Sequence, residues 1–194
     1  HRDLHSFPTR RSSDLGMIAP VEKAIHERLG EYVWGYDDDT PEQAAGKSLM
    51  EKGLSVAVME MCTGGALANS ITDNPNSISY FKGGNVAYDG AALRSCGVPG
   101  EVMEKHGVVS QETANAMAET VRRNLNADVG IAVTGVPGPG EFEGKPLGLA
   151  YICVSNGEKI RGMEMRLPPR RVTIKRRVPN QALIELRRLV EETG

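Results

Sequence analysis

The chain has 194 residues, of which 40% are hydrophobic and 25% are charged, and its formal net charge is −2. This length allows one domain with a substantial core, and the charge balance gives no reason to expect a nucleic acid or an acidic membrane as partner. No apolar run approaches the roughly 20 residues that span a bilayer. The sequence therefore predicts a globular domain without a membrane or nucleic-acid partner.

The pattern of cysteines and histidines indicates a reducing environment and predicts no metal site. The chain has three cysteines, which are widely spaced and form no CxxC motif: Cys62, Cys96 and Cys153. Together with the lack of a secretory h-region, this favours a cytoplasmic location over a disulfide framework. The four histidines show no ligand spacing, so we expect no zinc site.

The first fifteen residues, "HRDLHSFPTRRSSDL", are polar and rich in arginine and serine. Such a composition is typical of a disordered tail. The string also resembles the conceptual translation of a sequencing adapter. We therefore expect residues 1–16 to be a non-native disordered tail, with the natural protein beginning near Met17 and a single domain over 17–194.

The next two segments predict helices. In "PVEKAIHERLGEYVW" the apolar residues recur at helical spacing, and Pro20 suits the first turn. In "TPEQAAGKSLMEKG", Thr40 and Gln43 can form a capping box, Pro41 fits the first helical position and Gly53 can end the helix. The short apolar run "LSVAVME" that follows predicts a buried strand.

The middle of the chain continues the alternation of helices and strands. A helix is expected from Gly64 or Gly65 to Asp73, followed by a loop at "DNPNS". The segment "ISYFKGGNVAYDG" predicts two short extended pieces broken at Gly83-Gly84, where the glycines indicate a bulge or a close approach of the backbone. Ser110 then caps the clearest helix of the chain, and "DVGIAVTGV" predicts a second buried strand.

The last third predicts a hairpin and a helix. "LGLAYICVS" and "KIRGMEMRL" are typical of strands joined by a turn at Asn156-Gly157. The tail predicts a helix that Pro179 should kink or restart. The expected fold is an α/β protein: a three-layer α/β/α sandwich with a mixed, largely parallel sheet and an antiparallel edge.

Two loops follow buried strands, "EMCTGG" and "TGVPGPG". Ligands of open α/β sheets bind beyond the carboxyl ends of the strands, so both loops should lie on one rim. Their glycines let backbone N–H groups approach a phosphate-bearing small molecule, although plain turn geometry explains the same glycines. Cys62 is the only ionisable nucleophile of the first loop, and a small buried hydrophobe is its alternative interpretation.

Five cations gather near the C-terminal end of the chain. They could contact a phosphate or RNA, but nearby acids and the absence of interleaved aromatics weaken a nucleic-acid role. Helical spacing places some of them on one exposed face, which is usually solvated surface. The cluster comprises Arg170, Arg171, Lys175, Arg176 and Arg177.

Several motifs together resemble one family. "AVMEMCTGG", "YFKGGNVAYDGAAL", "HGVVSQETANAMAETVRRNLNADVGIAVTGVPGPG" and "GKPLGLAYI", spread in order over about 54–189, are similar to the C-terminal domain of the CinA competence/damage-inducible family. The resemblance implies a nicotinamide-nucleotide amidase, which hydrolyses nicotinamide mononucleotide to nicotinic acid mononucleotide and ammonia in pyridine-nucleotide recycling. It implies no metal or other cofactor, and a homodimer.

The resemblance also implies a set of site residues, which this chain matches only in part. The family's nucleophilic serine corresponds to Met61 and its lysine to Leu93, whereas its tyrosine is kept as Tyr88 and its threonine as Thr134. Two catalytic groups are therefore replaced. The residues expected to bind substrate are Cys62, Thr63, Gly64, Gly65, Gly83, Gly84, Gly135 and Gly138.

Three hypotheses follow from these replacements. A thioether at residue 61 has no proton to lose and cannot attack an amide, and losing a nucleophile costs on the order of a millionfold in a well-studied protease. We therefore expect a domain that binds a nucleotide, or acts in interactions, and is inactive or nearly so as an amidase. The alternatives are an active amidase that uses Cys62, and a sequence whose Met61 and Leu93 are errors or deliberate changes.

Overall fold

The computed structural model describes residues 12–193, which divide into two compact units with a boundary between Asp38 and Asp39. The described part of the first unit contains α1 (Ser12–Leu29) and the short 3-10 helix η1 (Gly30–Tyr32). The helix thus begins before Pro20 and includes residues that the sequence assigned to a disordered tail. Residues 1–11 of that expected tail lie outside the described residues.

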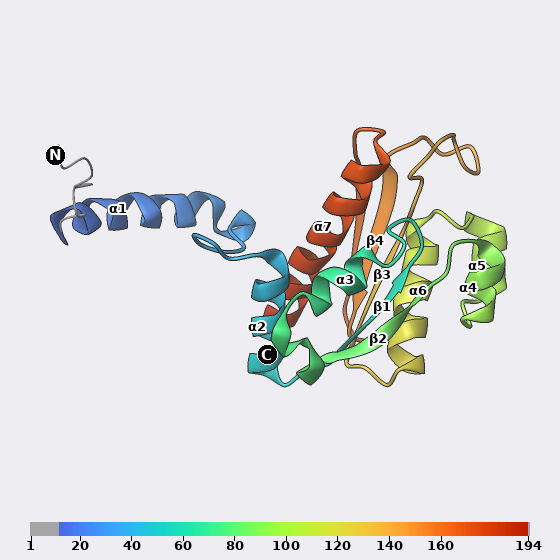
Figure 1. Cartoon of the computed structure of the whole chain (residues 1–194), viewed down its shortest axis with the longest axis horizontal. Helices are drawn as coiled ribbons and strands as arrows, with labels where there is room; N and C mark the ends of the chain where they lie inside the picture. Colours follow the sequence, from blue (N-terminus) through green and yellow to red (C-terminus); the bar gives the residue numbers. More distant parts are fainter. Residues whose placement is uncertain (1–11, 194) are drawn as a thin grey trace, which may run out of the picture. The chain divides into compact units, whose positions relative to one another are not determined.

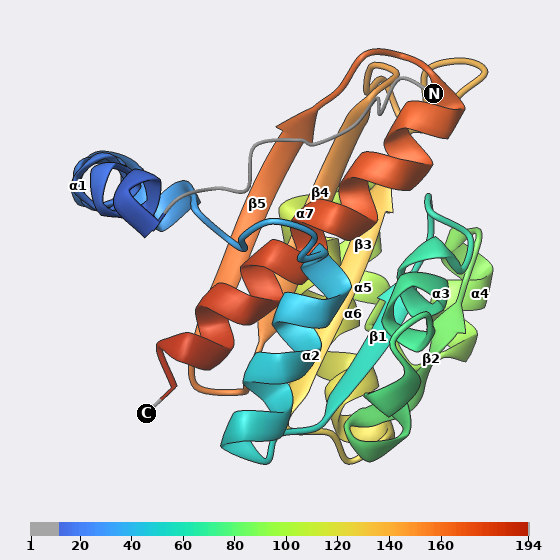
Figure 2. The same ribbon diagram turned by 60° about the vertical axis from the view of Figure 1, so that its left-hand side comes forward.

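The second unit is built on one five-stranded sheet covered by helices on both faces (Figures 1 and 2). Its elements are α2 (Pro41–Lys52), β1 (Val56–Glu60), α3 (Ala66–Thr72), η2 (Pro75–Ser79), β2 (Phe81–Val86), α4 (Gly90–Ser95), α5 (Gly100–His106), α6 (Gln111–Asn124), β3 (Val129–Gly135), β4 (Leu149–Ser155), β5 (Ile160–Arg166) and α7 (Arg171–Glu191).

The strand order is β2-β1-β3-β4-β5. β2, β1 and β3 run parallel, whereas β4 and β5 pair antiparallel at the other edge. Helices α2, α3 and α7 cover one face, and α4, α5 and α6 lie on the opposite face (Figure 2). The predicted three-layer α/β/α sandwich with a mixed sheet and an antiparallel edge is confirmed.

The parallel register decides where the site lies. Glu60 at the end of β1 is opposite Val86 of β2 and Val133 of β3. The carboxyl ends of the three strands therefore meet at one edge of the sheet. The loops that leave β1 and β3 consequently share one rim, as the sequence predicts.

Local signals in the sequence set several helix ends. The Thr40 hydroxyl accepts from the Gln43 backbone N–H, the Gln43 side chain accepts from Thr40 N–H, and Gly53 ends α2 in the left-handed conformation. The Ser110 side chain likewise accepts from Thr113 N–H at the start of α6. These caps satisfy backbone donors that a helix end leaves unpaired, so the predicted starts of both helices are confirmed.

Three expectations differ from the structure. β2 is one strand and not two pieces, because its main-chain pairing with β1 continues through Gly84. The register shift between Val56 and Ala57 confirms the predicted irregularity beside Gly83. A β-carbon at Gly84 would lie 2.4 Å from Val58 Cγ2, so this glycine is required by close packing on β1. α7 runs unbroken through Pro179, since burial of its apolar face against the sheet keeps the helix continuous. The short helices α4 and α5 were not expected.

Within residues 12–193, no helix is long and apolar enough to cross a membrane.

Candidate functional site

The candidate site lies where the segment after β1 turns into α3. Met61 N–H donates to the Val133 carbonyl of β3 at 3.0 Å, and Ala87 N–H donates to the Glu60 carbonyl at 2.9 Å. These bonds extend the sheet by one residue beyond β1 and bring the ends of three strands together. The side chain of residue 61 is thereby fixed at the rim between β1 and β3.

Glu60 organises the loop that follows. Its carboxylate is fully buried and accepts hydrogen bonds from the Thr63 hydroxyl at 2.6 Å and from the backbone N–H groups of Gly65, Leu67 and Ala68 at 3.0, 3.0 and 2.7 Å. The carboxylate therefore satisfies the free donors at the start of α3 and ties the Gly64-Gly65 turn to the end of β1. The sequence analysis did not predict this role of Glu60. The signal that could have indicated it is an acid at the end of a strand, followed by "TGG" and a short helix.

Met61 is largely buried, with 7% of its surface exposed. The Thr134 hydroxyl lies 3.2 Å from Met61 Sδ and donates to the Val108 carbonyl at 2.9 Å. The structure thus brings together residue 61 and Thr134, the two positions that the family resemblance implies for a serine and a threonine. At this point of the rim the chain has a thioether in place of a hydroxyl.

Leu93, which the family resemblance implies to be the lysine position, is completely buried on α4. It belongs to the same apolar cluster as Met61, together with Ala87, Val98 and Met103. The position therefore lies on the same side of the sheet as residue 61. It carries an apolar side chain in an apolar environment, so it supplies neither a base nor a charge.

Tyr88 is on the outer part of the rim, 56% exposed. Arg171, the first residue of α7, donates to the Tyr88 hydroxyl at 2.9 Å and also to the Gly138 carbonyl. Arg171 therefore links the loop after β2 to the loop after β3. The sequence analysis did not predict this contact for Arg171, because it joins segments that are far apart in the chain.

A groove opens between the start of α3 and α7. Its volume is about 470 Å³, and it is lined by Gly64, Gly65, Ala66, Asn69, Ser70, Lys175, Arg176 and Asn180. A β-carbon added at Gly64 would lie 3.7 Å from Lys175 Nζ and 4.0 Å from Tyr88 Cε2. The predicted glycine turn thus borders a hollow with two cations, which suits an anionic ligand of nucleotide size.

The other predicted binding residues lie at different depths. Thr63 is fully buried and its hydroxyl donates a hydrogen bond to the Glu60 carboxylate, so it stabilises the loop from the protein interior. Gly135 ends β3, where a β-carbon would lie 2.7 Å from the Leu149 carbonyl oxygen, and Gly138 is in the following loop beside Arg171. Gly83 and Gly84 lie within β2, opposite Ala57 and Val58, before the strand reaches the rim. Close packing on Val58 of β1 explains Gly84, whereas Gly83 has a φ of 114°, a backbone conformation that favours glycine.

Cys62 does not have the environment of a reactive thiol. It is 2% exposed, and burial, the largest cause, raises its pKa to about 12. A backbone hydrogen bond lowers this pKa by less than burial raises it, and the nearby Glu60 carboxylate adds a still smaller increase. Cys62 therefore stays protonated at neutral pH, whereas a nucleophilic cysteine requires the thiolate.

Alkylation should distinguish the three cysteines. Iodoacetamide at pH 8 is expected to modify Cys96, which is partly exposed, and to leave Cys62 and Cys153 unmodified in the folded protein. Burial raises the pKa of both Cys62 and Cys153 to about 12, so their thiolates form only at much higher pH. Peptide mapping by mass spectrometry measures the modification, with all three sites labelled in denaturant as the control. Labelling of Cys62 as fast as Cys96 would contradict this picture.

Among residues 12–193, no group of three or more histidine, cysteine, aspartate or glutamate side chains is placed to hold a metal ion. The groups that the structure places at the site are backbone donors, hydroxyls and cations. These groups bind and orient an anionic ligand.

Comparison with known proteins identifies relatives over most of the chain. The family model described as the CinA C-terminal domain matches residues 38–190. A competence-damage inducible protein of Desulforamulus reducens is 41% identical over 169 residues, which are 87% of this chain and 41% of that relative. A protein of the same description from Natranaerobius thermophilus is 34% identical over 193 residues, 99% of this chain and 47% of the relative. The chain thus spans less than half the length of these relatives.

Solved structures have the same fold. The competence/damage inducible protein CihA of Agrobacterium tumefaciens has a TM-score of 0.71 and 28% identity, over 81% of this chain and 99% of that one. A CinA superfamily protein of Klebsiella pneumoniae 700603 has a TM-score of 0.75 and 23% identity, over 78% of this chain and 96% of that one. The α/β fold is therefore one that these structures share.

Proposed function

The chain belongs to the CinA C-terminal domain family, and from this premise we propose that it binds a nicotinamide mononucleotide-like nucleotide at the rim but hydrolyses it poorly or not at all. Nicotinamide mononucleotide is the substrate that the family resemblance implies. The observation that carries the proposal is the side chain at residue 61: a methionine, contacted by Thr134, stands where an amidase of this family requires a serine.

Binding is supported by the groove beside the glycine turn. Lys175 and Arg176 line it, and neither has an ion-pair partner among the described residues. Cations without a carboxylate partner are available to a phosphate group. The Gly64-Gly65 turn, held in place by Glu60, brings the main chain to the edge of this groove. We assign the phosphate of the nucleotide to this groove.

Poor hydrolysis is supported by two replacements, which together remove the nucleophile and the ionisable group that would assist it. Acyl transfer from a carboxamide needs a nucleophile with a base beside it. Residue 61 lacks the nucleophile, and Leu93 lacks an ionisable group. Cys62 does not replace them, because its buried thiol has a pKa of about 12.

The binding proposal predicts stabilisation by ligand. Nicotinamide mononucleotide at 100 times its Kd should raise the free energy of unfolding by about 2.7 kcal/mol. Nicotinamide riboside, which lacks the phosphate, should stabilise less. Lys175→Ala should remove much of the difference in stabilisation between the mononucleotide and the riboside. Lys105 is an exposed lysine on α5, and Lys105→Ala should leave this difference unchanged.

Thermal unfolding with each ligand measures this effect, and an ammonia assay on the same samples tests hydrolysis. The absence of any shift at millimolar nicotinamide mononucleotide would contradict binding. Rapid ammonia release by the parent chain would contradict the proposed inactivity.

A further inference from the structure

The first two turns of α7 concentrate positive charge in an unusual place. Arg170 precedes the helix, Arg171 begins it, and the first turn contains no acid. The helix dipole already makes this end positive, so each added cation here is unfavourable. The complete cluster is Arg170, Arg171, Lys175, Arg176 and Arg177. None of the five takes part in an ion pair among residues 12–193.

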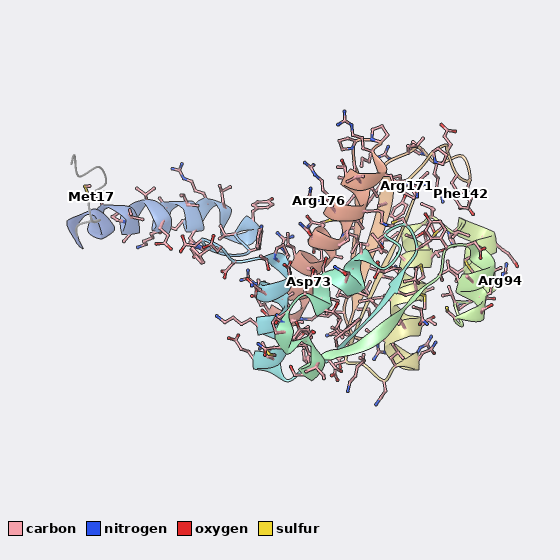
Figure 3. The ribbon with its side chains drawn as sticks, viewed as in Figure 1. Met17, Asp73, Arg94, Phe142, Arg171 and Arg176 are labelled. Carbon is pink, nitrogen blue, oxygen red and sulfur yellow. The ribbon has the colours of Figure 1, made fainter. Side chains whose placement is uncertain are left out.

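Two hollows lie along this charged segment. The first is the groove beside Gly64-Gly65, into which Lys175 and Arg176 extend. The second has a volume of about 410 Å³ and is lined by Val172, Thr173, Arg176, Arg177 and Asn180. The two hollows share Arg176 and Asn180, so they are neighbours along the helix. Figure 3 shows Arg171 and Arg176 on this part of α7, with Arg94 on α4 at a distance from them.

The polar residues of the second hollow occupy one stripe of α7. Thr173, Arg176, Arg177 and Asn180 follow the spacing i, i+3, i+4, i+7, which places them on the same face of a helix. This stripe offers two guanidinium groups, a hydroxyl and an amide. A guanidinium presents five N–H donors, so Arg176 between the hollows can bind phosphoryl oxygens on both sides.

We propose that this face of α7 binds a second phosphoryl group, so that the site also takes nucleotides with two linked phosphoryl groups. The first phosphoryl group binds in the groove beside Gly64 and the second in the hollow beside Arg177. An anion in each hollow offsets the repulsion among the cations, and it also offsets their repulsion by the positive end of the helix dipole. The inference rests on the proposed function for the first hollow and adds the diphosphate class of ligand.

Calorimetric titration of the folded chain with inorganic phosphate, inorganic pyrophosphate, nicotinamide mononucleotide and nicotinamide adenine dinucleotide tests the proposal. Pyrophosphate is expected to bind at least tenfold tighter than phosphate, and the dinucleotide tighter than the mononucleotide. Arg177→Ala should lower the affinity for pyrophosphate about tenfold and leave nicotinamide mononucleotide binding unchanged. Arg94→Ala removes the same charge from an exposed site on α4 and should change neither affinity.

The outcomes separate this inference from the proposed function. If nicotinamide mononucleotide binds but Arg177→Ala affects pyrophosphate no more than Arg94→Ala does, the second site is refuted and the proposed function stands. If pyrophosphate binds through Arg177 and nicotinamide mononucleotide does not bind, the two-phosphoryl site stands and the proposed function fails. Tighter binding of a short single-stranded oligonucleotide than of pyrophosphate, lost in Arg177→Ala, would overturn the inference in favour of nucleic acid.

Discussion

The double variant Met61→Ser/Leu93→Lys is expected to release ammonia from nicotinamide mononucleotide at least about a hundredfold faster than the parent chain, because it restores a nucleophile and a base together. Thr134, whose hydroxyl already reaches the residue-61 side chain, and the Glu60-supported loop remain in place. The restored lysine enters an apolar cluster, which lowers its pKa and lets it accept a proton near neutral pH.

The control is Met61→Ala/Leu93→Lys, which makes a similar change in size and charge without a nucleophile. A continuous ammonia assay on both variants, with the folded state checked by circular dichroism, measures the difference. Leu93→Lys costs stability because a charge enters the core, so the assay is run well below the melting temperature. Equal rates for the two variants, in protein that binds the nucleotide, would show that residues 61 and 93 are not the catalytic positions.

Glu60→Gln is expected to lower the free energy of unfolding by about 3 kcal/mol, and Tm by roughly 6–12 °C. The carboxylate is fully buried and accepts four hydrogen bonds. In glutamine an NH₂ group replaces one acceptor oxygen, so buried donors face another donor. The change also loosens the Gly64-Gly65 turn, and nucleotide affinity should fall with stability.

The matched control is Glu51→Gln on α2, where the side chain is exposed and the expected change is below about 0.5 kcal/mol. Chemical denaturation of both variants gives the two free energies. A Glu60→Gln protein as stable as the Glu51→Gln protein would mean that the loop does not depend on this carboxylate.

Much of the fold follows from local patterns. The capping box at Thr40 and Gln43, the cap at Ser110 and the hairpin turn at Asn156-Gly157 are confirmed, because each depends on residues a few positions apart. The continuity of α7 through Pro179 could not be predicted this way. It depends on packing against the sheet, which outweighs the local tendency of proline to interrupt a helix.

Some features of the candidate site likewise follow from the sequence, and others depend on the tertiary structure. The sequence by itself determined the family motifs and the shared rim, and it predicts that Met61 stands at the position of the family's nucleophile, because these depend only on residue identity and strand order. The tertiary structure decided that Cys62 is a buried and protonated thiol and that Arg171 contacts Tyr88. Burial and contacts between distant segments arise only when β1, β3 and α7 pack together, so no local pattern encodes them.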